Sequence, residues 1–237
     1  MNDDRDRFED LSPGERLAER DRTHPEPMKR PEMPQAGNKY AWLVGILLFM
    51  GLAVLLFVQT IPNSGEGLKG PKPGTHLKDF AAPSALGSIE GDANVCQRKP
   101  CPEQAGPVPA CSLLRPDIVN ICELRKRPLV LTFIFDRGAD CYPQVDRTER
   151  IKDDLPGVQF ATLFFSHKKR HEIAGLVRER GWTQPVAVDQ DGQVANLYGV
   201  GGCPTTIFAR PGGRVTLTAL GNMTEAELRT QAERLTR

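Results

Sequence analysis

A lone cysteine stands in the sequence between an apolar run and a segment with helical spacing. The run "PLVLTFIF" precedes "RGADCYPQVD", which contains Cys141 followed at once by Tyr142 and Pro143. At a helix N-terminus, unpaired backbone N–H groups and the positive end of the helix dipole favour a thiolate, the nucleophilic form of cysteine. Pro143 suits the first helical turn, where its missing N–H costs nothing. We expect Cys141 to be a reactive thiol; an inert structural cysteine is the alternative.

The charges near Cys141 act in opposite directions. The carboxylate of Asp140 raises the cost of ionising the neighbouring thiol, and Arg137 and Arg147 offset that cost. We therefore expect a reactive thiol whose pKa is not extreme.

The cysteines of the whole chain are even in number and unevenly placed. The chain has six cysteines, which fits disulfides if it faces an oxidising compartment. Four of them lie in a Pro-rich segment, 91–122, and we expect them to form two structural disulfides: Cys96, Cys101, Cys111 and Cys122. Three connectivities are possible. A zinc site is the alternative, although paired Cys-x-x-Cys motifs are missing, and we predict no metal.

An apolar run predicts where the cysteines lie in the cell. Residues 41–58 carry no charge and would span about 27 Å as a helix, close to the hydrocarbon thickness of a bilayer. Tyr40 and Trp42 stand where an interfacial aromatic belt would place them. We predict an uncleaved transmembrane helix at 40–61. All six cysteines follow it, so we expect the N-terminus in the cytoplasm and residues 62–237 outside.

The rest of the chain divides by composition. Residues 1–39 are charged and Pro-rich, which predicts a disordered cytoplasmic tail. Residues 62–75 are Gly- and Pro-rich and predict a flexible linker. We predict that residues 76–237 form the folded domain. The formal net charge of +1 gives no electrostatic case for nucleic acid.

The domain alternates strands and helices. Apolar runs predict strands at "PLVLTFIF", "VQFATLFF" and "PVAVD", followed by a hairpin around residues 211–213. Helical spacing predicts helices at 143–155 and 168–180. A capping box, Thr224 and Glu227, opens a final helix. This order predicts an α/β domain whose central sheet is covered on both faces.

Four stretches resemble a known family: "LKDFAAPSALGS", "CELRKRPLVLTFIF", "PVAVDQDGQVANLYGVGGCPTTIFARPGGRV" and "LGNMTEAELRTQAERL". They are similar to the thioredoxin-like superfamily, and within it to membrane-anchored thiol–disulfide oxidoreductases of the TlpA/redoxin type. The resemblance covers residues 76–237 and implies a central mixed sheet with a C-terminal β-hairpin and helices on both faces.

The resemblance assigns roles to individual residues. Cys141 takes the nucleophile position and Pro204 the cis-proline position. Gln144 stands where the family has its resolving cysteine, and Asp140 where it has a tryptophan. The residues expected to form the cis-proline and substrate-binding surface are Tyr142, Pro143, Gln144, Pro204 and Thr205.

Cys203 is the candidate partner for Cys141. In the resembling fold, the loop before the cis-proline faces the nucleophile, so Cys203 could replace the missing resolving thiol. Cys141 would attack a target disulfide and Cys203 would release the mixed disulfide. A permanent bridge, or thiols left unpaired or holding a metal, are the alternatives.

We therefore expect a thiol–disulfide oxidoreductase that acts on extracytoplasmic protein thiols or disulfides and needs no cofactor. One alternative is a disulfide-stapled binding module without redox activity. Another is a peroxiredoxin-like peroxidase, although Ile134 and Gly138 replace the Pro and Thr of that motif.

Overall fold

The computed structural model of the chain describes residues 12–15, 18, 38–60, 68–136 and 140–237. It divides into two compact units, residues 1–62 and residues 63–237. The predicted tail, 1–39, lies almost entirely outside the described residues, and so do Arg137 and the first part of the predicted linker.

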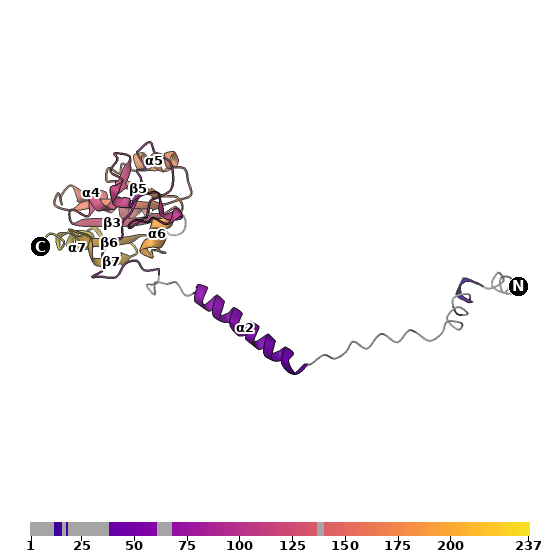
Figure 1. The fold of residues 1–237 in the computed structure, drawn as a ribbon. Coiled ribbons are helices and arrows are strands. Elements are labelled where there is room, and N and C mark those ends of the chain that lie inside the picture. Colours follow the sequence, from indigo (N-terminus) through magenta and orange to yellow (C-terminus); the bar gives the residue numbers. More distant parts are fainter. Residues whose placement is uncertain (1–11, 16–17, 19–37, 61–67, 137–139) are drawn as a thin grey trace, which may run out of the picture. The chain divides into compact units, whose positions relative to one another are not determined.

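In the N-terminal unit the structure describes one long helix, α2 (Asn38–Thr60), which covers residues 40–60 of the predicted span 40–61 (Figure 1). Its apolar side chains Trp42, Leu47 and Phe49 are all more than 60% exposed. Among the residues that the structure describes, no helix is both long and apolar enough to cross a membrane. The transmembrane segment therefore stays a prediction.

The second unit is built on a five-stranded sheet in the order β5-β4-β3-β6-β7 (Figure 1). The strands are β3 (Leu129–Phe135), β4 (Gln159–Phe165), β5 (Val186–Asp189), β6 (Thr205–Arg210) and β7 (Arg214–Leu220). β3 is parallel to β4 and β4 to β5, whereas β6 is antiparallel to both β3 and β7. The predicted mixed sheet with a C-terminal hairpin is confirmed.

Four helices accompany this sheet: α4 (Tyr142–Lys152), α5 (Arg170–Glu179), α6 (Gln193–Tyr198) and α7 (Glu225–Glu233). α5 falls within the predicted helix 168–180, whereas α4 begins one residue before the predicted helix 143–155 and ends three residues earlier. The Thr224 side chain accepts a hydrogen bond from the Glu227 N–H, which completes the predicted capping box. α6 was not predicted as a helix.

Alternate residues of the central strand face two different layers. Leu131 and Phe133 of β3 pack in a cluster that includes residues of α3 and α6. Ile134 packs with residues of α4 and α5, and Val130 with residues of α4 and α7. Because neighbouring side chains on a strand point to opposite faces, this arrangement shows helices on both sides of the sheet.

The segments ahead of the sheet form a smaller layer: β1 (Ala81–Pro83), the 3-10 helices η1 (Glu103–Ala105) and η2 (Ala110–Ser112), β2 (Ile118–Asn120) and α3 (Ile121–Leu124). β1 and β2 pair with each other as antiparallel strands. The predicted linker differs from what is observed. The Gly70 N–H donates to the Gly199 carbonyl at 2.9 Å and the Gly74 N–H to the Val215 carbonyl at 2.8 Å, so this part of the chain is attached to the domain.

A buried carboxyl group positions the start of α6. Asp189, at the end of β5, is fully buried and accepts hydrogen bonds from the N–H groups of Ala195 at 2.9 Å and Val194 at 3.3 Å. Burial raises the pKa of the Asp189 carboxyl to about 7, because it disfavours the charged form, although the two N–H groups act in the opposite direction.

The raised pKa makes the stability of the domain depend on pH. The folded-state pKa lies above that of the unfolded chain, so the contribution of Asp189 is complete below about pH 4 and is lost as the pH rises to about 7. We expect the wild-type free energy of unfolding to fall by about 1–3 kcal/mol more than that of Asp189→Asn between those pH values. Urea denaturation at both pH values measures this.

The exposed neighbour Asp191 provides the control, because Asp191→Asn removes a nearby charge and leaves the buried carboxyl in place. That variant should keep most of the pH dependence. Parallel pH profiles for the wild type and Asp189→Asn would contradict the assignment.

Candidate active site

The two cysteines of the predicted redox pair are joined. Cys141, directly before α4, forms a disulfide with Cys203, two residues before β6, and their Cα atoms are 5.7 Å apart. This separation lies within the usual range for a disulfide. The peptide bond between Cys203 and Pro204 is cis. The backbone N–H of Phe135, the last residue of β3, donates a hydrogen bond to Cys203 Sγ at 3.1 Å.

The two cysteines differ in exposure. Cys141 is 1% exposed, whereas Cys203 is half-buried. In the disulfide form, Cys203 is therefore the member of the pair that is more open to an incoming group.

The first residues of α4 lie against aromatic neighbours. The ring of Tyr142 makes edge contacts with Phe164 at 5.9 Å and Trp182 at 6.0 Å between ring centroids. The guanidinium of Arg180 lies 4.9 Å from the centroid of the Tyr142 ring, a cation–π distance. Burial, with a further contribution from the Asp136 carboxylate, raises the pKa of the Tyr142 hydroxyl. Tyr142 therefore stays a neutral phenol at physiological pH.

The other residues predicted to form the substrate-binding surface differ in their exposure to solvent. Pro143 is half-buried next to Tyr142, whereas Pro204 and Thr205 are buried. The hydroxyl of Thr205 donates to the carbonyl oxygen of Gly202 at 2.7 Å, which supports the loop carrying Cys203. The accessible part of the site is thus formed by the beginning of α4 and by Cys203.

Gln144 has a structural function at this site. It is fully buried; its Nε2 donates to Thr206 Oγ1 at 3.2 Å, and its Oε1 accepts from the Met223 N–H at 2.9 Å. One side chain thereby connects α4 to β6 and to the loop before α7. Sequence reasoning predicted Gln144 as a substrate-binding residue. A signal for the structural function was present, because an amide on the inward side of a helix needs partners.

Gln144 reaches a row of threonines across the middle of the sheet. Thr162, Thr132 and Thr206 are direct neighbours on β4, β3 and β6. The hydroxyls of Thr132 and Thr162 are buried and have no hydrogen-bond partner among the described residues. The centre of the sheet therefore carries a row of polar side chains. Gln144, which replaces the expected second cysteine of α4, is hydrogen-bonded to one end of this row at Thr206.

Asn222 links Arg147 to the backbone of Asp140, so the predicted charge compensation at the Asp140 carboxylate stays a prediction. Arg147 donates to the side-chain oxygen of Asn222 at 2.8 Å, and the Asn222 amide donates to the carbonyl oxygen of Asp140 at 3.4 Å. Arg147 is thus connected to Asp140 through Asn222.

The four cysteines of the segment 91–122 form two further disulfides. Cys96 pairs with Cys101, and Cys111 pairs with Cys122. Of the three connectivities left open by the sequence, the structure has the one that joins neighbours along the chain. All six cysteines are therefore in disulfides.

Known structures resemble this fold at low sequence identity. No protein-family model and no curated protein sequence matches the chain. A protein of Chlorobium tepidum described as a candidate thiol:disulfide interchange protein, DsbE, is 18% identical with a TM-score of 0.53, over 70% of this chain and 99% of its own. An uncharacterised Geobacillus kaustophilus protein is 13% identical with a TM-score of 0.52, over 69% and 82%. A hypothetical Sinorhizobium meliloti protein is 15% identical with a TM-score of 0.51, over 70% and 84%.

The hydrogen bonds of Gln144 lead to a prediction about stability. Gln144→Met keeps a similar volume but removes both polar groups, so the half-buried Met223 N–H loses its acceptor and the buried Thr206 hydroxyl loses its donor. We expect the free energy of unfolding to fall by about 1–3 kcal/mol. Denaturant unfolding measures this, with Gln231→Met on the outer part of α7 as the matched control. If both variants lose equally little, these bonds do not hold α4 in place.

Proposed function

We propose that this chain, which has the thioredoxin-like fold, is a membrane-tethered thiol–disulfide oxidoreductase that acts on extracytoplasmic protein thiols or disulfides. Cys141 is the nucleophile and Cys203 the resolving thiol. The observation that carries the proposal is the disulfide between Cys141 and Cys203, formed next to a cis peptide bond at Pro204.

The reaction has two exchange steps. In the dithiol form, the Cys141 thiolate attacks one sulfur of a target disulfide, and the other target sulfur leaves as a thiolate. The Cys203 thiolate then attacks Cys141 Sγ in the mixed disulfide, which forms the Cys141–Cys203 bond and releases the second target sulfur. Two electrons pass from the protein to the target. The same steps in reverse oxidise a target dithiol.

The surroundings of both sulfurs favour thiolates. Cys141 occupies the N-cap position of α4, where the helix dipole and the free N–H groups stabilise negative charge. Cys203 Sγ accepts the Phe135 N–H bond, which would strengthen as the sulfur becomes charged. Either thiol can thus leave as a thiolate, as reversible exchange requires.

Two features support the proposed location. Residues 41–58 carry no charged side chain, and the apolar side chains of α2 that the structure describes are exposed, which suits a lipid environment. All six cysteines are paired, which is typical of oxidising compartments outside the cytoplasm. The proposed arrangement places the N-terminus in the cytoplasm and the thioredoxin-like domain outside.

Two observations favour a second function. Cys141 is only 1% exposed, and Gln144 is committed to structural hydrogen bonds. In a redox-inactive binding module, the Cys141–Cys203 bond would be permanent and would serve only to connect α4 with β6.

Trapping of mixed disulfides tests the proposal. In Cys203→Ser, the mixed disulfide on Cys141 cannot be resolved, so we expect reductant-sensitive adducts with substrate proteins on non-reducing gels. Cys141→Ser should form none, and the double variant is the control for adventitious thiols. Adducts with Cys141→Ser alone would show that the two roles are exchanged.

The reduction potential of the Cys141–Cys203 bond separates the enzyme from the binding module. We expect a value above about −300 mV in equilibrium with glutathione or dithiothreitol, because structural disulfides generally lie lower. A Cys141–Cys203 disulfide that is not reduced in these glutathione or dithiothreitol equilibria would support the binding module.

A further inference from the structure

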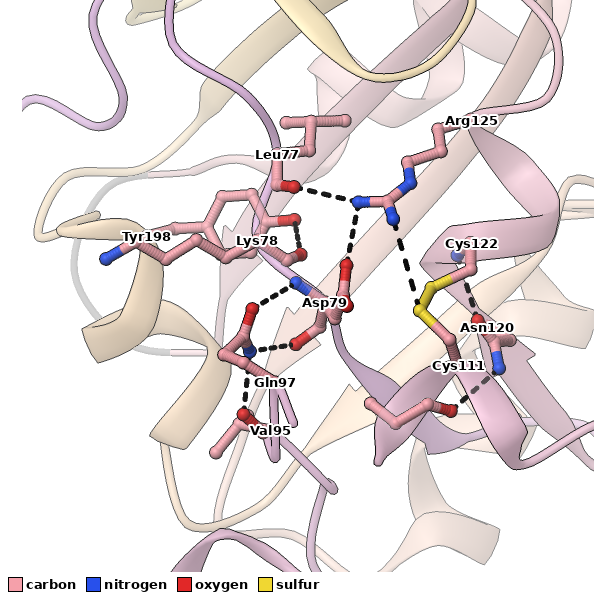
Figure 2. Close-up of polar contacts among 11 residues, drawn as sticks. Leu77, Lys78, Asp79, Val95, Gln97, Cys111, Asn120, Cys122, Arg125 and Tyr198 are labelled. Carbon is pink, nitrogen blue, oxygen red and sulfur yellow. Dashed lines mark hydrogen bonds and ion pairs between the residues drawn. A yellow bond between two sulfur atoms is a disulfide. The ribbon is translucent and has the colours of Figure 1, made fainter. Parts of the chain in front are cut away.

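The Cys111–Cys122 disulfide lies in a cluster of charged groups outside the site described above. Figure 2 shows the guanidinium of Arg125 between this disulfide and the carboxylate of Asp79. Arg125 Nη2 is 4.0 Å from Cys111 Sγ, and Arg125 Nη1 is 2.8 Å from the Asp79 carboxylate. The side chains of Arg125 and Asp79 are each only 22% exposed, so water screens their charges less than at a fully exposed site.

Arg125 is held in this position by the surrounding backbone. Its Nη1 also donates to the Leu77 carbonyl oxygen at 2.9 Å, and its own carbonyl accepts from the Gly212 N–H at 2.7 Å. A Cβ on Gly213 would lie 2.9 Å from Arg125 Cδ, so the glycine at this turn permits the close approach. The cation beside Cys111 is therefore fixed by the fold.

We propose that Cys111–Cys122 is a second thiol–disulfide exchange site, in which Cys111 leaves as a thiolate stabilised by Arg125. A cation close to a sulfur lowers the pKa of its thiol, and a sulfur with a lower pKa is displaced faster. Both cysteines are half-buried, so a reductant has access to them.

The exchange step balances with an external dithiol as the reductant. One thiolate of the dithiol attacks Cys122 Sγ; a mixed disulfide forms, and Cys111 leaves as a thiolate beside Arg125. The second thiol of the reductant then attacks its own sulfur in that mixed disulfide and releases Cys122. Two electrons pass from the dithiol, which becomes a disulfide, to Cys111 and Cys122.

The other disulfide of the same segment is an internal control. Cys96 is 1% exposed, and its Sγ contacts the carbonyl oxygen of Arg98 at 3.5 Å. A carbonyl oxygen is a partial negative charge, which disfavours a thiolate. Cys96–Cys101 should therefore be reduced more slowly than Cys111–Cys122.

The same cluster contains side chains that could bind a metal ion. The donor atoms of Asp79, Cys111 and Cys122 lie within 4.8 Å of one another. However, the two sulfurs are bonded to each other and the Asp79 carboxylate is paired with Arg125, a cation that would repel a metal ion. These contacts favour exchange over metal binding.

The test measures the rate at which each disulfide of the oxidised full-length protein is reduced by dithiothreitol. Acid quenching, differential alkylation and peptide mass mapping follow all three bonds at once. We expect Arg125→Gln to slow the reduction of Cys111–Cys122 about three- to tenfold, and Arg125→Lys to keep most of the wild-type rate. Asp79→Asn should accelerate it, because the carboxylate no longer neutralises Arg125.

The opposite signs separate the proposal from a structural effect, since loosening of the fold would accelerate reduction in every variant. The rate of Cys96–Cys101 should not change in any of them. The Cys141→Ser/Cys203→Ser double variant should keep the wild-type rate at Cys111–Cys122, because this site does not depend on the proposed catalytic pair. An equal or faster rate in Arg125→Gln overturns the proposal, and so does an unchanged or slower rate in Asp79→Asn.

Discussion

The attachment of α4 to the central sheet determines the geometry of the Cys141–Cys203 pair. The disulfide holds the residue before the helix, and Gln144 holds the first turn through its bonds to Thr206 and Met223. Near the end of α4, Ile151 packs in the cluster that includes residues of α7. Because the covalent bond and the polar bonds act on the same turn, reduction of the disulfide would still leave that turn attached to β6.

The two cysteines of the pair lie on different elements of the fold. In a Cys-x-x-Cys motif both sulfurs belong to the same helical turn. Here the second sulfur belongs to the loop before β6, across the site from α4. Opening the bond would therefore release the loop that carries Cys203 from the start of α4, while Gln144 keeps α4 bonded to β6. The position left by the missing cysteine is occupied by a side chain that keeps these elements aligned.

The central strands could be predicted from the sequence because their pattern is strong and local. The runs around Phe133 and Leu163 are apolar except for the central Thr132 and Thr162, as expected for strands buried on both faces. The capping box at Thr224 also follows from a short motif, whereas the position of Cys203 opposite Cys141 was implied by the family resemblance. In these cases the residue types themselves limit the alternatives.

Other features depend on partners that the sequence does not identify. Gln144 looked like a substituted active-site position, and its function became clear only with Thr206 and Met223 beside it. Residues 69–75 have the composition of a linker, yet their backbone groups bind Gly199 and Val215. α6 is one short helix that ends at left-handed Gly199, too short for its periodicity to be read. Four cysteines likewise allow three pairings until the fold brings two pairs together.

β6 runs from the Cys141–Cys203 disulfide toward the turn that bonds Arg125, the residue beside the Cys111–Cys122 disulfide. Cys203 precedes this strand, next to the end of β3, and the turn that follows β6 is bonded to Arg125. Six residues of extended chain span about 20 Å, several times the reach of a disulfide. Cys141–Cys203 and Cys111–Cys122 therefore lie in different surroundings, the first beside the end of β3 and the second beside Arg125. Under the two exchange proposals, each pair is a two-electron couple of its own, with its own potential.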